Sequence, residues 1–494
     1  MGKSGGTNQE FKWRVGGIPG LGLGLSADVY SPDLFDLMRQ FAGRQSQPAY
    51  LEIFRATGTA LQTVRQHFPA VPMTYHGEGL WVTQPGTPAT AFFDSEVEDV
   101  CRQLTILGSP WLNHECATKQ MAGYSFGTYL PPLYTTESAR VVAGNIALVQ
   151  ARMDRMCRGS RSCGPLFLLE VAPLTYFMAG TISVPRFFRL VTDLVPCGLV
   201  LDIGHLWTIY RYAAAQRCES LERFVERFLH EFPVERVVEI HVAGLAPHEL
   251  SSRNSLHQPD ANWLDAHAAP IQPVSWAMLE QVLASPRLIN LRGVALEVDT
   301  KPVDTIVDEF HEANLRFGQT IVRRTAVSSR RPEKDAVQFA PQAGVRCASP
   351  EDGQRLHDDY LSYAKIVTGQ QEPAGPQWQG VLDERAGLNR YVNEYLPYEI
   401  LHWGGAIAEM FPESCRALAE AGVSLDELVA WWFRTARPVD QPYDFFLLKI
   451  DRVLGFVSER APSIFALAQR EAELLRQAYA EANDRVEPVM ETVR

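Results

Sequence analysis

Histidine and carboxylate side chains close, or directly follow, several short apolar segments of this sequence. A strand that is buried on both faces is apolar along its length, and a charged or imidazole group at its end is costly unless it is paired or bound to a metal. Imidazole nitrogens and carboxylate oxygens suit iron, manganese, zinc or magnesium better than a thiolate site would. The candidate metal ligands of this kind are His76, His114, Glu170, Asp202, His205, His241, Asp265, His267 and Glu297.

Nine candidates are too many for one ion, because a catalytic metal usually takes three or four protein ligands. The set therefore predicts more than one ion, with some carboxylates bridging. Each residue taken alone is more often a hydrogen-bonded structural side chain, so the prediction depends on the joint pattern. Five histidines lack this position and are interpreted as ordinary surface or core residues: His67, His230, His248, His257 and His311.

The elements that would position these side chains alternate between short strands and helices. Apolar runs predict strands at residues 50–54, 71–75, 166–170, 199–202, 237–242 and 293–298. Helical spacing occurs between them, for example at 33–43, 95–107, 136–157, 220–232 and 276–284. This alternation predicts an α/β fold with parallel strands, best matched by a (β/α)₈ TIM barrel, whose strands end at one shared face. An open doubly wound sheet is the alternative, but no GxGxxG or Walker-type loop supports it.

The last third of the chain differs in character from residues 14–325, the predicted barrel. Residues 326–345 are polar, basic and Pro-containing, which predicts a linker. Residues 346–494 have helical spacing throughout, which predicts a smaller, mainly α-helical domain. Ser424 and Glu427, for example, have the spacing of a capping box that begins a helix. Only two of the twelve histidines lie here, so we expect this domain to have no metal chemistry.

Composition restricts the function classes further. The chain has 494 residues, of which 46% are hydrophobic and 21% charged, as in folded globular proteins. Its net charge of −12 argues against a broad nucleic-acid surface, and no apolar run approaches the ~20 residues of a membrane span. Residues 1–13 are polar and Gly-rich without a secretory core, which predicts a flexible end and a cytoplasmic protein. The eight cysteines include no CxxC pair and are interpreted as reduced thiols.

A series of short motifs resembles the multinuclear non-heme iron-dependent oxidative enzymes, a family that includes the methanobactin-biosynthesis oxidase. The resemblance covers residues 14–325, and EIHVAG followed by D-x-H is its most specific part. The motifs are, in chain order, GLGLS (22–26), YLE (50–52), HGEGL (76–80), NHE (113–115), LLE (168–170), LDIGH (201–205), EIHVAG (239–244), DAH (265–267) and LEVD (296–299).

The resemblance implies a TIM barrel with two or three iron ions, Fe(II) or Fe(III), bound by the nine candidate ligands at its C-terminal face. It implies an oxidase or oxygenase that uses dioxygen as co-substrate to modify a ribosomally made precursor peptide. The expected target is a Cys residue whose thiolate binds one iron, with hydrogen abstraction from the β-carbon of the substrate.

Individual roles also follow from the resemblance. Glu170 would bridge two irons, Asp202 and His241 would hold one ion, and His76 and His114 would complete another. The third ion, or the position of the substrate, would be served by His205, Asp265 and His267. The catalytic residues implied are Glu170, Asp202, His241 and Asp265, and the substrate-binding residues implied are Glu52, Asn113 and Asp299.

Two departures from the family pattern put parts of this assignment in doubt. Family members commonly have Asn directly after the glutamate of the LLE motif, where this chain has Val171. An acidic residue is common before His114, where this chain has Asn113. A two-iron site or a different substrate residue would be consistent with either change.

The C-terminal domain has two interpretations. Residues 401–457 resemble the helical part of the small partners that capture precursor peptides for many family members, which would make this protein a fusion with its own peptide-recognition module. The alternative is a generic helical bundle in which the aromatic residues form the core: Trp431, Trp432, Phe445 and Phe446.

Two other functions remain open for the barrel itself. The first is a divalent-metal hydrolase or isomerase that acts on a sugar-like or phosphate-containing small molecule. The second is a peptide-binding protein that has lost its chemistry, which only Val171 suggests.

Overall fold

A computed structural model supplies the structure of the protein. It describes residues 4–44, 46–90, 92–157, 163–247, 263–326, 349–439 and 442–484. The linker predicted at residues 326–345 lies, except for its first residue, outside the described residues. None of the described helices combines the length and the apolar character needed to cross a membrane.

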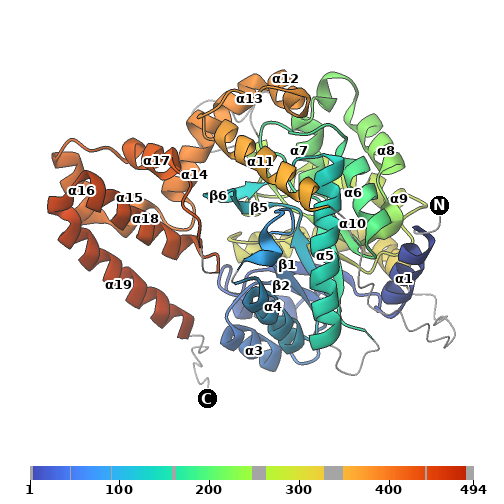
Figure 1. The fold of residues 1–494 in the computed structure, drawn as a ribbon. Coiled ribbons are helices and arrows are strands. Elements are labelled where there is room, and N and C mark those ends of the chain that lie inside the picture. Colours follow the sequence, from blue (N-terminus) through green and yellow to red (C-terminus); the bar gives the residue numbers. More distant parts are fainter. Residues whose placement is uncertain are drawn as a thin grey trace, which may run out of the picture.

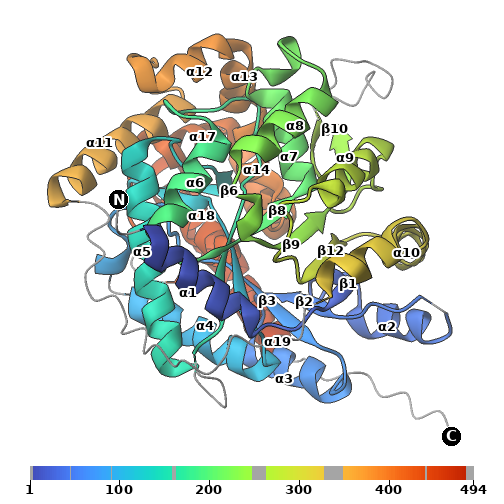
Figure 2. The same ribbon diagram turned by 90° about the vertical axis from the view of Figure 1, so that its right-hand side faces the viewer.

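Eight parallel strands close into a barrel in the order β1-β12-β9-β8-β7-β4-β3-β2 (Figures 1 and 2). This confirms the predicted TIM barrel. Each strand is short and almost entirely buried, because helices cover its outer side and side chains fill the barrel. The strands are β1 (Gly22–Ala27), β2 (Leu51–Phe54), β3 (Met73–Gly77), β4 (Trp111–Glu115), β7 (Leu166–Glu170), β8 (Gly198–Asp202), β9 (Val237–Val242) and β12 (Gly293–Glu297).

Helices follow the strands on the outside of the barrel, and several begin at a side-chain cap. Thr135, for instance, accepts a hydrogen bond from the backbone N–H of Ser138, and Ser220 accepts one from Arg223. The covering helices are α2 (Leu34–Ala42), α3 (Gly58–His67), α4 (Phe93–Leu107), α5 (Thr136–Met156), α6 (Val184–Leu194), α7 (Ile203–Tyr212), α8 (Leu221–Glu231), α9 (Pro273–Ala284) and α10 (Val303–Thr325).

The N-terminal segment corrects the prediction of a flexible end, because residues 4–16 form helix α1 (Ser4–Gly16). Phe11 and Val15 lie one helical turn apart and are buried at the floor of the barrel. Arg14 pairs with Asp154 of α5, with 2.6 Å between the guanidinium and the carboxylate. Figure 2 shows α1 lying across this end of the barrel. These few anchoring residues could not be recognised in a segment whose composition is mostly polar.

Alternation along the strands divides the barrel interior into two levels. The lower level is mostly apolar and contains Tyr50 and Trp111 together with Leu168 and Val200. The Tyr50 hydroxyl at this level donates a hydrogen bond to Glu239. Successive inward residues are two apart in a strand, and the next inward positions toward the carboxyl ends are acidic, imidazole or amide side chains. A polar site is therefore supported from below by a packed apolar floor.

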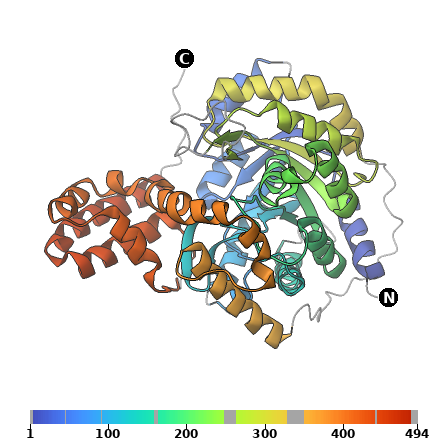
Figure 3. The same cartoon turned by 90° about the horizontal axis from the view of Figure 1, so that it is seen from above.

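The C-terminal residues form the predicted helical region, which lies at the end of the barrel opposite to α1 (Figures 1 and 3). Capping boxes at Ser349–Asp352 and Ser424–Glu427 begin two of its helices, the second as predicted. The helices are α11 (Pro350–Val367), α12 (Gln379–Asp383), α13 (Arg385–Arg390), α14 (Leu396–His402), α15 (Ile407–Met410), α16 (Pro412–Glu420), α17 (Leu425–Arg434), α18 (Phe445–Arg460) and α19 (Phe465–Asp484). A π-helical turn, Tyr391–Tyr395, connects α13 to α14.

A hairpin of the barrel, β5 (Thr118–Met121) and β6 (Tyr124–Leu130), joins this region to the barrel mouth. The indole N–H of Trp432 donates to the carbonyl oxygen of Ser125, at 2.8 Å. The Phe445 ring lies so close to Gly127 that an added Cβ there would be 2.3 Å from it. Trp431 instead packs in the separate core of α15–α19. These aromatic residues are thus core and interface residues.

Candidate metal centre

Four side chains from the barrel strands meet at the upper level of the interior. His241 on β9 lies 3.1 Å from Glu297 on β12 and 3.3 Å from Glu170 on β7, measured from its Nδ1 to the nearer carboxylate oxygens. Asp202, the last residue of β8, completes the group, and each of the four offers a ligand atom within 4.8 Å of the others. All four are at most 2% exposed. Such a set of one imidazole and three carboxylates suits a divalent transition metal.

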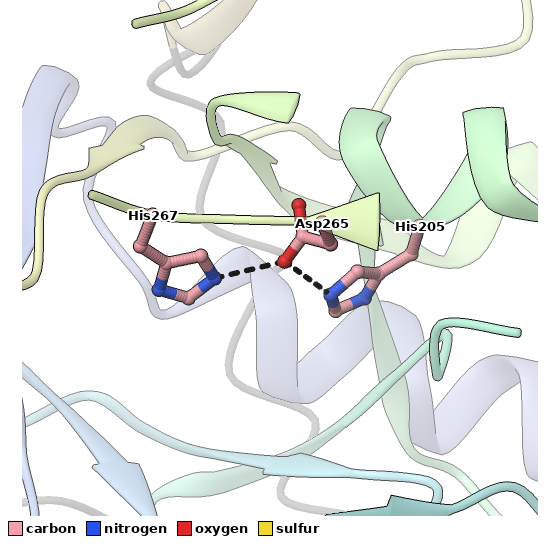
Figure 4. A group of neighbouring side chains, drawn as sticks. All are labelled: His205, Asp265 and His267. Carbon is pink, nitrogen blue, oxygen red and sulfur yellow. Dashed lines mark hydrogen bonds and ion pairs between the residues drawn. The ribbon is translucent and has the colours of Figure 1, made fainter. Parts of the chain in front are cut away.

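A second group, His205, Asp265 and His267, lines the cavity at the barrel mouth. Asp265 ends the short strand β11 (Trp263–Asp265), which pairs with β10 (Leu245–Pro247). Its Oδ2 lies 3.0 Å from Nε2 of His267 and 3.4 Å from Nε2 of His205, at the start of α7. Figure 4 shows the carboxylate between the two rings. Two imidazole nitrogens facing one carboxylate supply three of the donors that a metal ion needs.

Glu170 links the predicted ligands to one another. One of its oxygens faces His241, and the other lies 3.2 Å from Nε2 of His76 and accepts a 2.7 Å hydrogen bond from the amide of Asn113. Glu170 also belongs to a third group, with His205 and Glu115. Its Oε1 therefore faces both His241 and His205, so this carboxylate lies between the two ligand groups.

Burial and opposite charge shift the pKa values of these groups strongly. Burial alone would raise the pKa of Glu170, but the neighbouring His241 and His76 outweigh it and hold that pKa well below its usual value. Burial raises the pKa of Asp202 to about 7, although His205 opposes the shift. Burial lowers the pKa of His76, yet its hydrogen bond to Glu170 raises it to about 9. Without a bound ion, imidazolium groups would thus provide the positive charge that these buried carboxylates need, and a metal cation would take over that role.

Several buried polar atoms of the site have no hydrogen-bond partner among the described residues, and a metal ion would satisfy them. Orphaned buried polar atoms are costly and uncommon. Here they converge on the two groups: Glu170 Oε1, Asp202 Oδ2, His241 Nδ1, Asp265 Oδ1 and Glu297 Oε2. The chemistry of these donors fits iron as well as manganese or zinc.

Neighbouring groups orient the imidazoles. Nδ1 of His205 lies 2.6 Å from the carbonyl oxygen of Val171, and this contact places an N–H on Nδ1 and leaves Nε2 free to bind a metal. Nδ1 of His267 lies 3.1 Å from Asp299 in the same way. The backbone carbonyl of Val171 thus has an orienting role that does not depend on its side chain.

His114 is the one predicted ligand that the structure turns away from the site. It lies on the outward face of β4, where Nε2 accepts the backbone N–H of Leu80 and Nδ1 contacts the carbonyl oxygen of Glu115. Burial lowers its pKa to about 4, which keeps it neutral. Glu115, which is not among the nine ligands predicted from the sequence, points inward. The alternation of β4 from the inward Trp111 through Asn113 to Glu115 could have found it.

Two of the three predicted substrate contacts are also corrected. Glu52 and Asn113 are fully buried below the cavity described next, because their strand positions put them among the ligands and not above them. Glu52 lies 2.9 Å from Nε2 of His241 and accepts a hydrogen bond from Ser26. It therefore orients His241, as Asn113 orients Glu170. Asp299 does line the cavity.

A cavity of about 470 Å³ lies above the metal-binding groups. Its lower wall includes His76, Glu115, His205, Asp265, His267 and Glu297. The C-terminal region closes it with Tyr395, Glu399 and Trp403. Between the two parts, the Lys119 ammonium lies 2.6 Å from the Glu78 carboxylate. It also lies 4.3 Å from the centre of the Tyr129 ring and 4.2 Å from the centre of the Trp403 ring. The helical region is therefore a wall of the cavity.

The sequence profile of the RiPP precursor modification enzymes MbnB/TglH/ChrH matches residues 21–316. The chain belongs to this family. The resemblance found in the motifs is thereby confirmed, and the family is one of enzymes that modify precursors of ribosomally made peptides.

Individual relatives are distant. A UPF0276 protein of Paraburkholderia phytofirmans is 27% identical over 238 residues, which cover 47% of this chain and 67% of the relative. A UPF0276 protein of Caulobacter vibrioides is 26% identical over 208 residues, which cover 42% of this chain and 64% of the relative. Among solved structures, endonuclease IV of Thermus thermophilus is 18% identical, with a TM-score of 0.36 over 61% of this chain and 99% of the other.

Proposed function

We propose that this protein oxidises a ribosomally made precursor peptide in a reaction that depends on iron and dioxygen. The target is a Cys residue, and the reaction begins with hydrogen abstraction from its β-carbon. The observation that carries the proposal is Glu170, whose carboxylate joins buried ligand groups at the base of a cavity. Membership of a peptide-modifying family supports the substrate class.

The residues present fit two ions that share Glu170. One would be held by Glu170 with Asp202, His241 and Glu297, and the other by residues nearer the mouth, among them His205, Asp265 and His267. When bound, iron would supply the one-electron chemistry with dioxygen that these side chains lack. Glu52, Asn113, Asp299 and the Val171 carbonyl hold the ligands in place, which is the role of the residues that surround a metal centre.

The cavity suits one residue of a peptide rather than a long segment. Its volume of about 470 Å³ accommodates a side chain with its neighbouring backbone and lies in the range of small-molecule sites. The rest of the precursor would then lie outside, along the helical region that forms part of the cavity wall. This supports the interpretation of that region as a fused peptide-recognition module.

The arrangement of positive charge favours the peptide over a phosphate-containing small molecule. Arg55 and Lys119 both line the cavity, but Arg55 lies 3.0 Å from Glu96 and Lys119 lies 2.6 Å from Glu78. Because carboxylates already pair with these two cations, neither offers an uncompensated charge to a phosphate.

Mass spectrometry of a co-expressed peptide tests the proposal. The peptide is chosen from a short reading frame that neighbours the gene and encodes Cys residues. We expect a mass change that requires both the protein and air, and that is absent when the target Cys of the peptide is replaced by Ser. An unchanged Cys peptide in the presence of iron-loaded protein and air would contradict the proposal.

A further inference from the structure

Glu115 stands at the edge of the metal-binding groups without an assigned role. It is the last residue of β4, and it pairs in register with Glu170, the last residue of β7. Side chains of paired residues in neighbouring parallel strands lie on the same face, so both carboxylates point into the barrel. Glu115 is 8% exposed and lines the cavity.

The surroundings of Glu115 are those of a metal ligand. Glu115, Glu170 and His205 each offer a ligand atom within 4.8 Å of the others, and all three are buried. Oε2 of Glu115 and Oε1 of Glu170 have no hydrogen-bond partner among the described residues. Two adjacent buried carboxylates repel each other unless one of them takes up a proton or a cation lies between them. Burial raises the pKa of Glu115 to about 8, so a cation bound there would replace a proton.

The neighbouring groups leave His205 available for such a cation. Its Nδ1 is occupied by the carbonyl oxygen of Val171, at 2.6 Å. Nε2, the other nitrogen, is 3.4 Å from Asp265. His205 can therefore complete a site with Glu115 and Glu170 while Asp265 and His267 remain close by.

We propose that Glu115 is a metal ligand and that, with Glu170 and His205, it binds the ion nearest the cavity. The identity of that ion as iron rests on the proposed function, whereas the presence of the site does not. Glu115 and His205 line the cavity, but Asp202 and His241 are fully buried below it. A substrate in the cavity therefore reaches the ion at Glu115 before the deeper one.

Metal titration of variants tests this assignment without any oxidation chemistry. Metal-free protein is titrated anaerobically with Co²⁺ alone, and binding is followed by calorimetry and by the visible absorption of the bound ion. The variants are Glu115→Gln, Glu115→Ala and Glu115→Asp, with His114→Gln as the matched control from the outward face of the same strand. Circular dichroism and thermal melting establish that each variant is folded.

We expect the wild type and His114→Gln to bind at least two Co²⁺ per chain. Glu115→Gln and Glu115→Ala should lose one equivalent, or bind it at least tenfold more weakly, and Glu115→Asp should recover part of the loss because it keeps a carboxylate. Equal stoichiometry and affinity in Glu115→Gln and the wild type would overturn the assignment. Intact Co²⁺ binding together with a lack of oxygen chemistry would contradict the proposed function and leave Glu115 as a ligand.

Discussion

Glu170 and His241 face each other across β8, with 3.3 Å between Oε1 of the carboxylate and Nδ1 of the ring. Both are buried, and neither of these two atoms has a hydrogen bond among the described residues. The contact brings together the Glu170 carboxylate, which could bridge two metal ions, and the His241 ring nitrogen, which could bind only one.

Replacing Glu170 with Gln tests the bridge. An amide cannot bridge two cations as a carboxylate does, so we expect Glu170→Gln to lose at least one metal equivalent and to turn over peptide at least 100-fold more slowly. Metal analysis and single-turnover mass spectrometry measure the two effects. Glu226→Gln, at an exposed position on α8, is the control. Unchanged turnover and metal content in Glu170→Gln would contradict the bridging role of this carboxylate.

Trp403 tests the contribution of the helical region to the cavity. Its ring lines the cavity, where a bound peptide would contact it, and lies 4.2 Å from the Lys119 ammonium, a cation–π contact worth about 0.5–1 kcal/mol at an exposed site. We expect Trp403→Ala to raise the KM for the peptide by about tenfold with metal content unchanged, and Trp403→Phe to keep most of the wild-type value. An unchanged KM in Trp403→Ala would show that the substrate does not depend on this wall.

Lys449 predicts a pH dependence of stability. Burial lowers its pKa to about 8, and its ammonium donates to the carbonyl oxygens of Trp403 and Gly405. The unfolded chain keeps the usual pKa of about 10.4, so between these values it binds more protons than the folded chain, and stability rises with pH. Relative to Lys449→Met, the wild type should gain about 2 kcal/mol between pH 7 and pH 9.5.

Urea unfolding of metal-free protein at several pH values measures this difference. Because Lys449 belongs to the helical region, the transition should be followed by the fluorescence of its tryptophans. If the difference in unfolding free energy between the wild type and Lys449→Met does not change with pH, the Lys449 amine is not buried as it is in the structure.

Helix α1 should contribute to the unfolding free energy of the protein, although the composition of this segment suggested a flexible end. Phe11 is fully buried at the barrel floor, and the Arg236 guanidinium lies 4.4 Å from the centre of its ring. Truncating such a side chain typically costs about 3–5 kcal/mol, so Phe11→Ala should lower the unfolding free energy by that amount. Lys12→Ala, at an exposed position of the same helix, should change it by less than about 0.5 kcal/mol. Equal stability of the two variants would contradict the packing of α1.

The barrel and most of its candidate ligands could be predicted because strand ends are marked by residue type. An apolar run that is followed by Glu170, Asp202 or His241 predicts both a strand and a candidate metal ligand at its end. The direction of a side chain is a finer property, since a shift of one residue turns it to the other face. His114 and Glu115 are neighbours in the chain, and residue type alone favoured His114, whose side chain points outward.

Other features depend on contacts between distant parts of the chain. Nothing in the local sequence of Trp403 indicates that it lies beside Lys119, nearly 300 residues earlier. The burial of Glu52 under His241 likewise follows from barrel closure, which sets the level of each inward residue. These relationships required the folded structure.

The most direct test of the account is an anaerobic preparation followed by a measured exposure to oxygen. Metal analysis is performed first, and oxygen uptake is then followed with and without the precursor peptide. The account predicts about two or more irons per chain and peptide-dependent oxygen uptake in proportion to the modified peptide. One zinc per chain, with no oxygen uptake on any Cys-containing precursor, would contradict it.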